Sequence, residues 1–242
     1  MNLKENRRVC VVGLGNIGLP VAQHISRYFD TVGFDISEAA VNRAVAHGIK
    51  ASTRFKDSDI YVVAVNTWFR NGFPDMSAVE STCSKIVNKN ALVCLESTLA
   101  VGTARNLANM YRLSHVVVCP HRWWKEDQEN HGVVQLRVVG ALNIESMKLA
   151  QHFYRSIEIP IFPLSSLEAA ETAKIVENSH RFIQIAFSQE LRIVAEANGL
   201  NYEELRAACN TKWNVDLPEA RDGIGGECLP KDIRYLMFLH GH

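Results

Sequence analysis

The stretch VCVVGLGNIGLP, residues 9–20, decides the fold class of this chain. A short Val-rich run, typical of a buried strand, leads into Gly13, Gly15 and Gly18 in the spacing G-x-G-x-x-G and then into a helical pattern. The first glycine permits a tight turn, the second lets a pyrophosphate approach the backbone, and the third lets helix and strand pack closely. The stretch therefore predicts the start of a dinucleotide-binding unit, with the phosphates at the helix N-terminus.

The second predicted strand ends in FDIS, which places Asp35 17 residues after Gly18. A carboxylate at this place accepts hydrogen bonds from ribose hydroxyls and repels a 2′-phosphate. No Arg follows Asp35 closely, and Glu38 adds negative charge. The sequence therefore favours NAD over NADP as the cofactor.

Strand-like and helix-like segments alternate through the first two-thirds of the chain. The expected strands are Arg8–Val12, Thr31–Asp35, Ile60–Val65, Ala91–Glu96, Val116–Cys119, Leu136–Ala141 and Ile159–Leu164. The expected helices are Ile17–Tyr28, Glu38–His47, Ser77–Val87, Thr103–Met110 and Ile144–Arg155. This alternation predicts an α/β fold with a Rossmann-type, doubly wound parallel sheet.

The pattern changes after residue 163. Residues 166–198 contain no Pro or Gly, and their apolar positions recur at helical spacing, which predicts one long helix that ends at Asn198-Gly199. A shorter helix, Tyr202–Cys209, follows. We therefore expect an NAD-binding domain over residues 1–163 and an all-helical domain over residues 164–242.

The composition excludes several classes of protein. The 242 residues carry 26 basic and 26 acidic side chains, so no global charge favours nucleic acid. The apolar runs are too short to span a membrane, and the polar N-terminus does not resemble a signal peptide. The six cysteines form no C-x-x-C pair, which favours a reduced cytoplasm over a disulfide framework or a zinc site. His240 and His242 are typical of a solvated tail rather than a metal site.

Three further groups of polar residues are candidates for chemistry. Lys174 and Asn178 are four residues apart on the long helix, a spacing that a plain solvated surface explains at least as well. Glu96, Ser97 and Thr98 follow a buried strand, where ligands bind in doubly wound sheets, although the same residues also suit a helix cap. Cys228 lies in GIGGECLPKD, residues 223–232, with Lys231 near enough to favour a thiolate; an inert cysteine explains it equally well.

Together these motifs resemble the nucleotide-sugar 6-dehydrogenase family, which includes UDP-glucose and GDP-mannose dehydrogenases. The motifs that carry the resemblance are GLGNIGLP, FDIS, VAVNT, LESTLAVGT, AAETAKIVENSHRFIQIAFSQEL and GIGGECLPKD. They occur in the family's order over residues 9–236. A K-x-x-x-N helix followed by GG-x-C-x-x-KD is specific, and it turns the reading of Lys174 and Asn178 from surface to site.

The resemblance implies an enzyme that oxidises a sugar's primary alcohol twice, to an acid of the kind used in polysaccharide biosynthesis. Cys228 would hold the carbon as a thiohemiacetal and then as a thioester, which water hydrolyses. Lys174 and Asn178 would stabilise the oxyanion, and Thr98 and Asp232 would position water and relay protons. The cofactor would be lined by Gly13, Gly15, Asn16, Ile17, Gly18, Asp35, Thr67 and Thr98. The partner would be a UDP- or GDP-sugar.

The chain departs from the family in two places. The family has a glutamate directly after the proline of CP, which acts as acid/base in hydrolysis, whereas this chain has His121. Histidine also transfers protons near neutral pH, and a plain strand-end role is an equal alternative. The family continues into a third domain that grips the nucleotide, whereas this sequence stops after LMFLHGH. The resemblance therefore indicates a short form, or one completed by a separate chain.

Two other functions stay open at this point. One is an NAD-binding protein with impaired catalysis and a regulatory or assembly role. The other is a β-hydroxyacid-type dehydrogenase, which performs one oxidation and has no need of Cys228. The resemblance also implies a homodimer built through the helix over residues 166–198, whose apolar residues include Phe182, Ile183 and Phe187.

Overall fold

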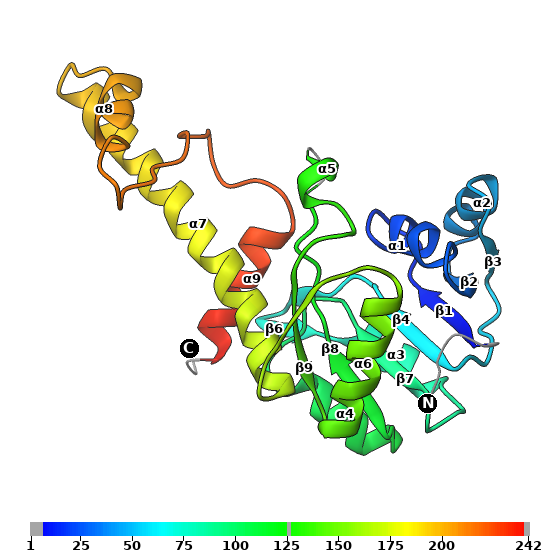
Figure 1. Ribbon diagram of the computed structural model, residues 1–242. Helices are drawn as coiled ribbons and strands as arrows, with labels where there is room; N and C mark the ends of the chain where they lie inside the picture. The colour runs from blue at the N-terminus through cyan, green and yellow to red at the C-terminus, as the bar shows by residue number, and fades with distance from the viewer. Residues whose placement is uncertain (1–6, 125–126, 240–242) are drawn as a thin grey trace. The chain divides into compact units, whose positions relative to one another are not determined.

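The computed structural model describes residues 7–124 and 127–239. The chain divides into two compact units, Met1–Ala173 and Lys174–His242. The first unit is a sheet flanked by helices, and the second consists of helices and their connections (Figure 1). This confirms the predicted fold class. His240 and His242 lie outside the described residues.

An eight-stranded sheet forms the centre of the first unit. Side by side, its strands are β10 (Ile161–Pro163), β9 (Arg137–Ala141), β8 (His115–Val118), β7 (Leu92–Leu95), β4 (Ile60–Val63), β1 (Arg8–Val12), β2 (Asp30–Phe34) and β3 (Lys50–Ser52). The strand order reverses between β1 and β4, whose carboxyl ends lie next to each other. Ligands bind doubly wound sheets in the crevice at such a switch point.

One strand pair differs from the predicted parallel sheet. β8 and β9 are antiparallel, with Val118 opposite Gly140, whereas the other neighbouring strands are parallel. A parallel pair needs a crossover, usually a helix packed on the sheet. The described part of the β8–β9 connection contains the one-turn helix α5 (Gln128–His131) instead, and the chain returns along the same edge of the sheet.

Alternate side chains of β1 enter two cores, one on each face of the sheet. Val9 and Val11 pack with α1 (Gly18–Ile25), α2 (Glu38–Ala46) and α6 (Ile144–Ser156). Cys10 and Val12 pack with α3 (Ser77–Ser84), α4 (Thr103–Tyr111) and the start of α7 (Leu167–Ala197). Because both faces are covered, the central strands β1, β4 and β7 are mostly apolar, which explains their Val-rich sequences. A small hairpin of β5 (Trp68–Arg70) and β6 (Phe73–Asp75) follows β4.

The helical unit contains most of α7, then α8 (Tyr202–Cys209) and α9 (Cys228–Leu239). The predicted long helix is confirmed, and it ends before Gly199, which has a left-handed φ of 68°. The sequence did not predict α9, because the glycines before it and Pro230 within it are typical of a loop. Proline is tolerated in a first helical turn, where its missing N–H has no intrahelical acceptor.

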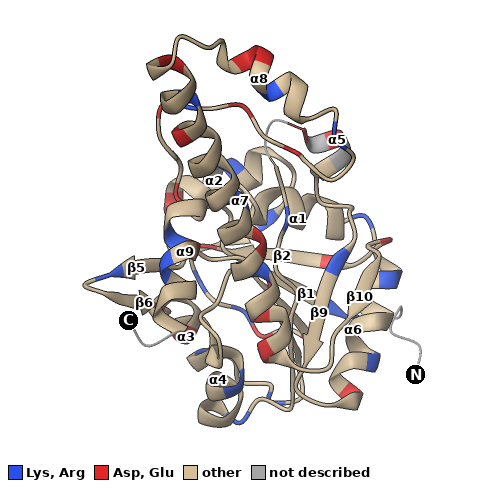
Figure 2. Cartoon of the chain, turned by 90° about the vertical axis from the view of Figure 1, so that its left-hand side faces the viewer, with Lys and Arg blue, Asp and Glu red and all other residues tan. Residues whose placement is uncertain are grey.

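Basic and acidic positions alternate along the helices and loops, so neither sign gathers on one element (Figure 2). No helix in the described ranges is long and apolar enough to cross a membrane.

Candidate functional site

The glycine turn after β1 is shaped by close packing. Gly13 has a φ of 89°, and a Cβ there would lie 2.4 Å from the carbonyl oxygen of Ala64. A Cβ on Gly18 would lie 1.7 Å from the carbonyl oxygen of Gly13. A Cβ on Gly15, by contrast, would meet no atom within 4 Å. Gly13 and Gly18 therefore serve the fold, whereas Gly15 leaves open space beside the backbone.

The start of α1 is suited to an anion. Ile17 occupies the N-cap position and no side chain caps the helix there, although the N–H of Leu19 donates to the carbonyl oxygen of Gly15 at 3.2 Å. The positive dipole end of α1 therefore meets no capping side chain. Asn16 is exposed and Ile17 is half-buried beside the open space at Gly15. These features fit a pyrophosphate at the turn.

Asp35 lies directly after β2 and faces the same turn. Its Oδ2 accepts from the backbone N–H of Leu14 at 2.7 Å, and its Oδ1 accepts from that of Ser37 at 2.8 Å. Each carboxylate oxygen has a second lone pair, so both retain capacity for ribose hydroxyls. The residues present therefore fit the dinucleotide that the sequence predicts.

The carboxyl ends of β4 and β7 are joined by two hydroxyl groups. Thr67 Oγ1 donates to the carbonyl oxygen of Thr98 at 2.7 Å. Ser97 Oγ accepts from the N–H of Val65 at 2.9 Å and donates to its carbonyl oxygen at 2.7 Å. The structure thus brings Thr67 and Thr98 together next to the switch point. That both residues line the cofactor stays a prediction.

A second set of predicted residues lies together in the helical unit. Asn178 Nδ2 donates to Asp232 Oδ2 at 2.5 Å, and Lys174 Nζ donates to Asn178 Oδ1 at 3.4 Å. Lys231 Nζ lies 2.7 Å from Asp232 Oδ1. Asp232 is fully buried, so it is a buried carboxylate held by an amide and an ammonium.

Cys228 is exposed and is the first residue of α9. Gly223 and Gly226, in the chain leading to it, have φ values of 100° and 82°, which side chains other than glycine rarely adopt. Asp232 follows Cys228 by four residues, so the two share a face of α9. The thiol therefore lies at a helix N-terminus beside the Asp232 group, which is a typical place for a reactive cysteine.

The electrostatics of Cys228 differ from the sequence-based expectation of a stabilised thiolate. Partial burial of the thiol and the charge of Asp232 raise its pKa, although Lys231 and Lys174 act to lower it. Lys231 thus acts in the expected direction, but its ammonium is paired with Asp232. Cys228 at rest is therefore a thiol that needs a base when it reacts.

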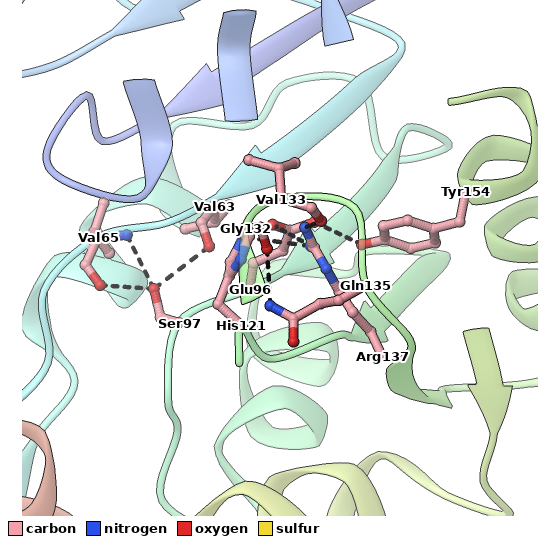
Figure 3. Close-up of polar contacts among 10 residues, drawn as sticks. All are labelled: Val63, Val65, Glu96, Ser97, His121, Gly132, Val133, Gln135, Arg137 and Tyr154. Atoms are coloured by element: carbon pink, nitrogen blue, oxygen red, sulfur yellow. Dashed lines mark hydrogen bonds and ion pairs between the residues drawn. The ribbon is translucent and has the colours of Figure 1, made fainter. Parts of the chain in front are cut away.

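Four polar side chains lie together in the interior at the ends of β7 and β8 (Figure 3). Glu96 Oε2 accepts from His121 Nε2 and from Arg137 Nη1, the latter at 3.0 Å, while Glu96 Oε1 accepts from the Tyr154 hydroxyl at 2.8 Å. Arg137 Nη2 also donates to the carbonyl oxygen of Val133 at 2.8 Å. We call Glu96, His121, Arg137 and Tyr154 the buried cluster.

The buried cluster holds Glu96 in its charged form. Burial alone would raise the pKa of Glu96, but the charges of Arg137 and His121 and the hydrogen bonds to the carboxylate lower it to about 2. Burial raises the pKa of Tyr154 well above its ordinary value, so Tyr154 donates as a neutral phenol.

Glu171, on the first part of α7, caps α4. Its carboxylate accepts from the N–H groups of Gly102 at 2.7 Å and Ala104 at 2.8 Å. Burial raises its pKa to about 7, against the two backbone hydrogen bonds. One turn earlier, Glu168 pairs with Arg105 at 2.5 Å nearer the surface. These contacts fix the start of α7 on the first unit.

The glycine turn, Asp35 and the switch in strand order define a Rossmann-type dinucleotide-binding protein. Residues 40–158 match the NAD binding domain of the UDP-glucose/GDP-mannose dehydrogenase family, and residues 168–241 match its central domain. The chain belongs to this family, as the resemblance implied, and its cofactor is NAD.

Several relatives are similar along nearly all of this chain. A UDP-N-acetyl-D-mannosamine dehydrogenase from Pyrococcus horikoshii is 30% identical over 271 residues, across 95% of this chain and 64% of its own length. One from Escherichia coli K12 is 29% identical with the same two coverages. A solved structure of the Pyrococcus horikoshii enzyme aligns with a TM-score of 0.84 at 28% identity, over 96% of this chain and 64% of that one. The chain thus spans just under two-thirds of the length of these relatives.

Sequence reasoning missed Arg137, Tyr154 and Glu171. Arg137 lies in the strand β9, and the one feature that could have drawn notice is its charge in an otherwise apolar run. Tyr154 and Glu171 lie at buried positions of α6 and α7. None of the three had a local partner in the sequence that would point to a site.

Proposed function

We propose that this protein takes part in the NAD-dependent oxidation of a nucleotide sugar to its uronic acid. The observation that carries the proposal is the linked set Lys174, Asn178 and Asp232, with Cys228 on the same face of α9 as Asp232. The similar proteins are named as dehydrogenases of UDP-N-acetyl-D-mannosamine, which supports a UDP-linked amino sugar as the substrate.

NAD, which the Gly13–Gly18 turn and Asp35 would hold, would supply the hydride acceptor for each of two oxidations. Between them, the sulfur of Cys228 forms a bond to the aldehyde carbon, and the thiol proton is transferred to the carbonyl oxygen, giving a thiohemiacetal. Loss of a hydride from that carbon and of the hydroxyl proton gives a thioester on Cys228. Water then adds to the carbonyl carbon, the C–S bond breaks, and the acid and the free thiol result.

The polar residues of the helical unit suit these steps. Lys174 and the second amide hydrogen of Asn178 stabilise negative charge on the substrate oxygen. Asp232 accepts the thiol proton and relays it. A base is needed at this step because the raised pKa of Cys228 keeps the thiol protonated. Thr98 positions water. We assign no proton transfer to His121, because its Nε2 is engaged by Glu96 in the interior.

The proposed assembly is a homodimer through α7. Val176, Ile183, Phe187 and Val194 recur at helical spacing, and each is between 46% and 57% exposed. An apolar stripe of this kind on a long helix suits an isologous contact with a second copy. The proposed compartment is the cytoplasm, in keeping with six free cysteines. A separate chain that grips the nucleotide stays a prediction.

The first test counts NADH formed per sugar consumed, with NAD and a panel of UDP- and GDP-sugars. Two NADH per sugar support the proposal. One NADH points to a single-step alcohol dehydrogenase of the β-hydroxyacid type. No turnover together with measured NAD binding points to the cofactor-binding protein without catalysis.

A matched pair of variants tests the thiol. Cys228→Ser should keep NAD binding and lose formation of the acid, because the weaker nucleophile cannot hold the carbon for the second oxidation. Cys209→Ser changes the other cysteine of the helical unit, half-buried on α8, and should be without effect. Equal activity of the two variants would contradict the covalent mechanism.

A further inference from the structure

The buried cluster lies at the carboxyl ends of β7 and β8, the edge of the sheet at which doubly wound proteins bind their ligands. Arg137 and Tyr154 are fully buried, and Glu96 and His121 are 3% and 5% exposed. Glu96 directly precedes Ser97 and Thr98, the turn that is joined to the end of β4. The cluster therefore adjoins the cofactor cleft from inside.

We propose that His121 is a positioning residue, which with Arg137 and Tyr154 fixes the Glu96 carboxylate and thereby the Ser97–Thr98 turn of the NAD site. This inference rests on the NAD assignment. It gives His121 a different role from the proton transfer that its place in the sequence suggested, and it gives roles to Arg137 and Tyr154.

The first step is that both carboxylate oxygens of Glu96 accept hydrogen bonds. One oxygen of Glu96 accepts from His121 and Arg137, and the other accepts from Tyr154. These donors come from the segment after β8, from β9 and from α6, so they hold Glu96 from three elements. A buried carboxylate with donors on both oxygens has one favourable position, because any movement leaves a buried charge without a partner.

The second step is the link between the position of Glu96 and the conformation of the Ser97–Thr98 turn. The N–H groups of Glu96 and Ser97 both donate to the carbonyl oxygen of Val63, at 2.9 and 3.1 Å. The hydroxyl of Ser97 then bonds to both backbone groups of Val65. The turn is thus fixed on one side by the buried cluster and on the other by the end of β4. Releasing Glu96 removes one of these two restraints.

The third step concerns the imidazole. A residue that exchanges a proton with substrate must reach it directly or through one water. The His121 side chain is 3% exposed, and its Nε2 faces Glu96 and lies 3.3 Å from Arg137 Nη1 (Figure 3). In this geometry the ring supplies an N–H to a buried carboxylate.

The experiment measures NAD affinity by calorimetry for the whole chain and for three variants, at a temperature where each is folded by circular dichroism. His121→Ala removes the donor, and His121→Gln keeps an amide N–H near the place of Nε2. His47→Ala is the matched control, since His47 is an exposed histidine at the end of α2. We expect the NAD Kd to rise at least about 10-fold in His121→Ala. We expect it to stay within about 3-fold of wild type in His121→Gln and to be unchanged in His47→Ala.

The outcomes separate the possible roles. A wild-type NAD Kd in His121→Ala would overturn the inference, and so would an equal loss in His121→Gln and His121→Ala. A proton-transfer role predicts wild-type NAD binding in both His121 variants with loss of turnover in both. Absence of NAD binding by the wild-type chain would instead contradict the assignment of NAD as the cofactor.

A second variant keeps the test decisive if His121→Ala does not fold. Tyr154→Phe removes the donor to Glu96 Oε1 with almost no change in volume. We expect a smaller rise in the NAD Kd, about 3-fold. An unchanged Kd in Tyr154→Phe would contradict the inference.

Discussion

Substitution of Gly15 by alanine should separate NAD binding from folding. The Cβ of the new alanine meets no atom of the protein within 4 Å, and Gly15 does not have a left-handed φ. Alanine also restricts the unfolded chain more than glycine does. We therefore expect the free energy of unfolding to be unchanged or to rise, by up to about 1 kcal/mol.

The same methyl group should weaken NAD binding. It fills the open space beside the turn, where a pyrophosphate approaches the backbone. The expected rise in the NAD Kd is at least about 10-fold, which corresponds to a loss of about 1.4 kcal/mol of binding free energy. Urea unfolding gives the stability, and calorimetry gives the Kd for the same preparation.

Gly13→Ala is the contrasting variant. Its φ of 89° costs an alanine about 1–2 kcal/mol, and the Cβ at 2.4 Å from a backbone oxygen forces the β4 end to move. Gly13→Ala should therefore lose stability as well as binding. A Gly15→Ala protein that binds NAD with wild-type affinity would refute the assignment of the open space to the pyrophosphate.

Three further predictions concern the thiol, a buried acid and the assembly. Cys228 should react with iodoacetamide faster than the four buried cysteines, and NAD or substrate should slow it; equal labelling would contradict a reactive thiol. For Glu171, burial raises the folded-state pKa to about 7 from an ordinary 4.5, so its contribution to stability is present below about pH 4.5 and is lost as pH rises to 7. Wild type minus Glu171→Gln should therefore show a free energy of unfolding that falls over this range in urea titrations, and a flat difference would contradict it. Light scattering should give a dimer mass for wild type and a monomer mass for Phe187→Asp, since a buried charge disrupts an apolar contact; a monomeric wild type would exclude the dimer.

Much of the fold could be predicted because its signals are local. The Val-rich runs around Gly13 and the uninterrupted helical spacing of α7 each specify their element from neighbouring residues. The strands β3, β5 and β6 have three residues each, too few for a periodic pattern. The antiparallel direction of β9 depends on how the connection from β8 returns the chain to the sheet, and not on the sequence of β9 itself.

The candidate site shows the same division. Cys228, Lys174 and Asn178 stood out by motif, and the structure adds that Cys228 begins a helix and that Asp232 joins it to Asn178. Arg137 stood out only as a charge in an apolar strand, which does not by itself indicate a site, because its partners Glu96 and His121 come from other elements. The role suggested for His121 depended on its neighbours in the sequence, whereas its neighbours in space are donors and acceptors of the interior.

The contacts of Glu168 and Glu171 with α4 have a consequence for synthesis of the chain. The first unit is contiguous and precedes the second, and the remaining 69 residues (242 − 173) take roughly 3–14 s to translate at 5–20 residues per second. The first turns of a helix are its costly nucleus. Because Glu168 and Glu171 fix these turns on α4, the first unit acts as a template from which the rest of α7 lengthens as it leaves the ribosome.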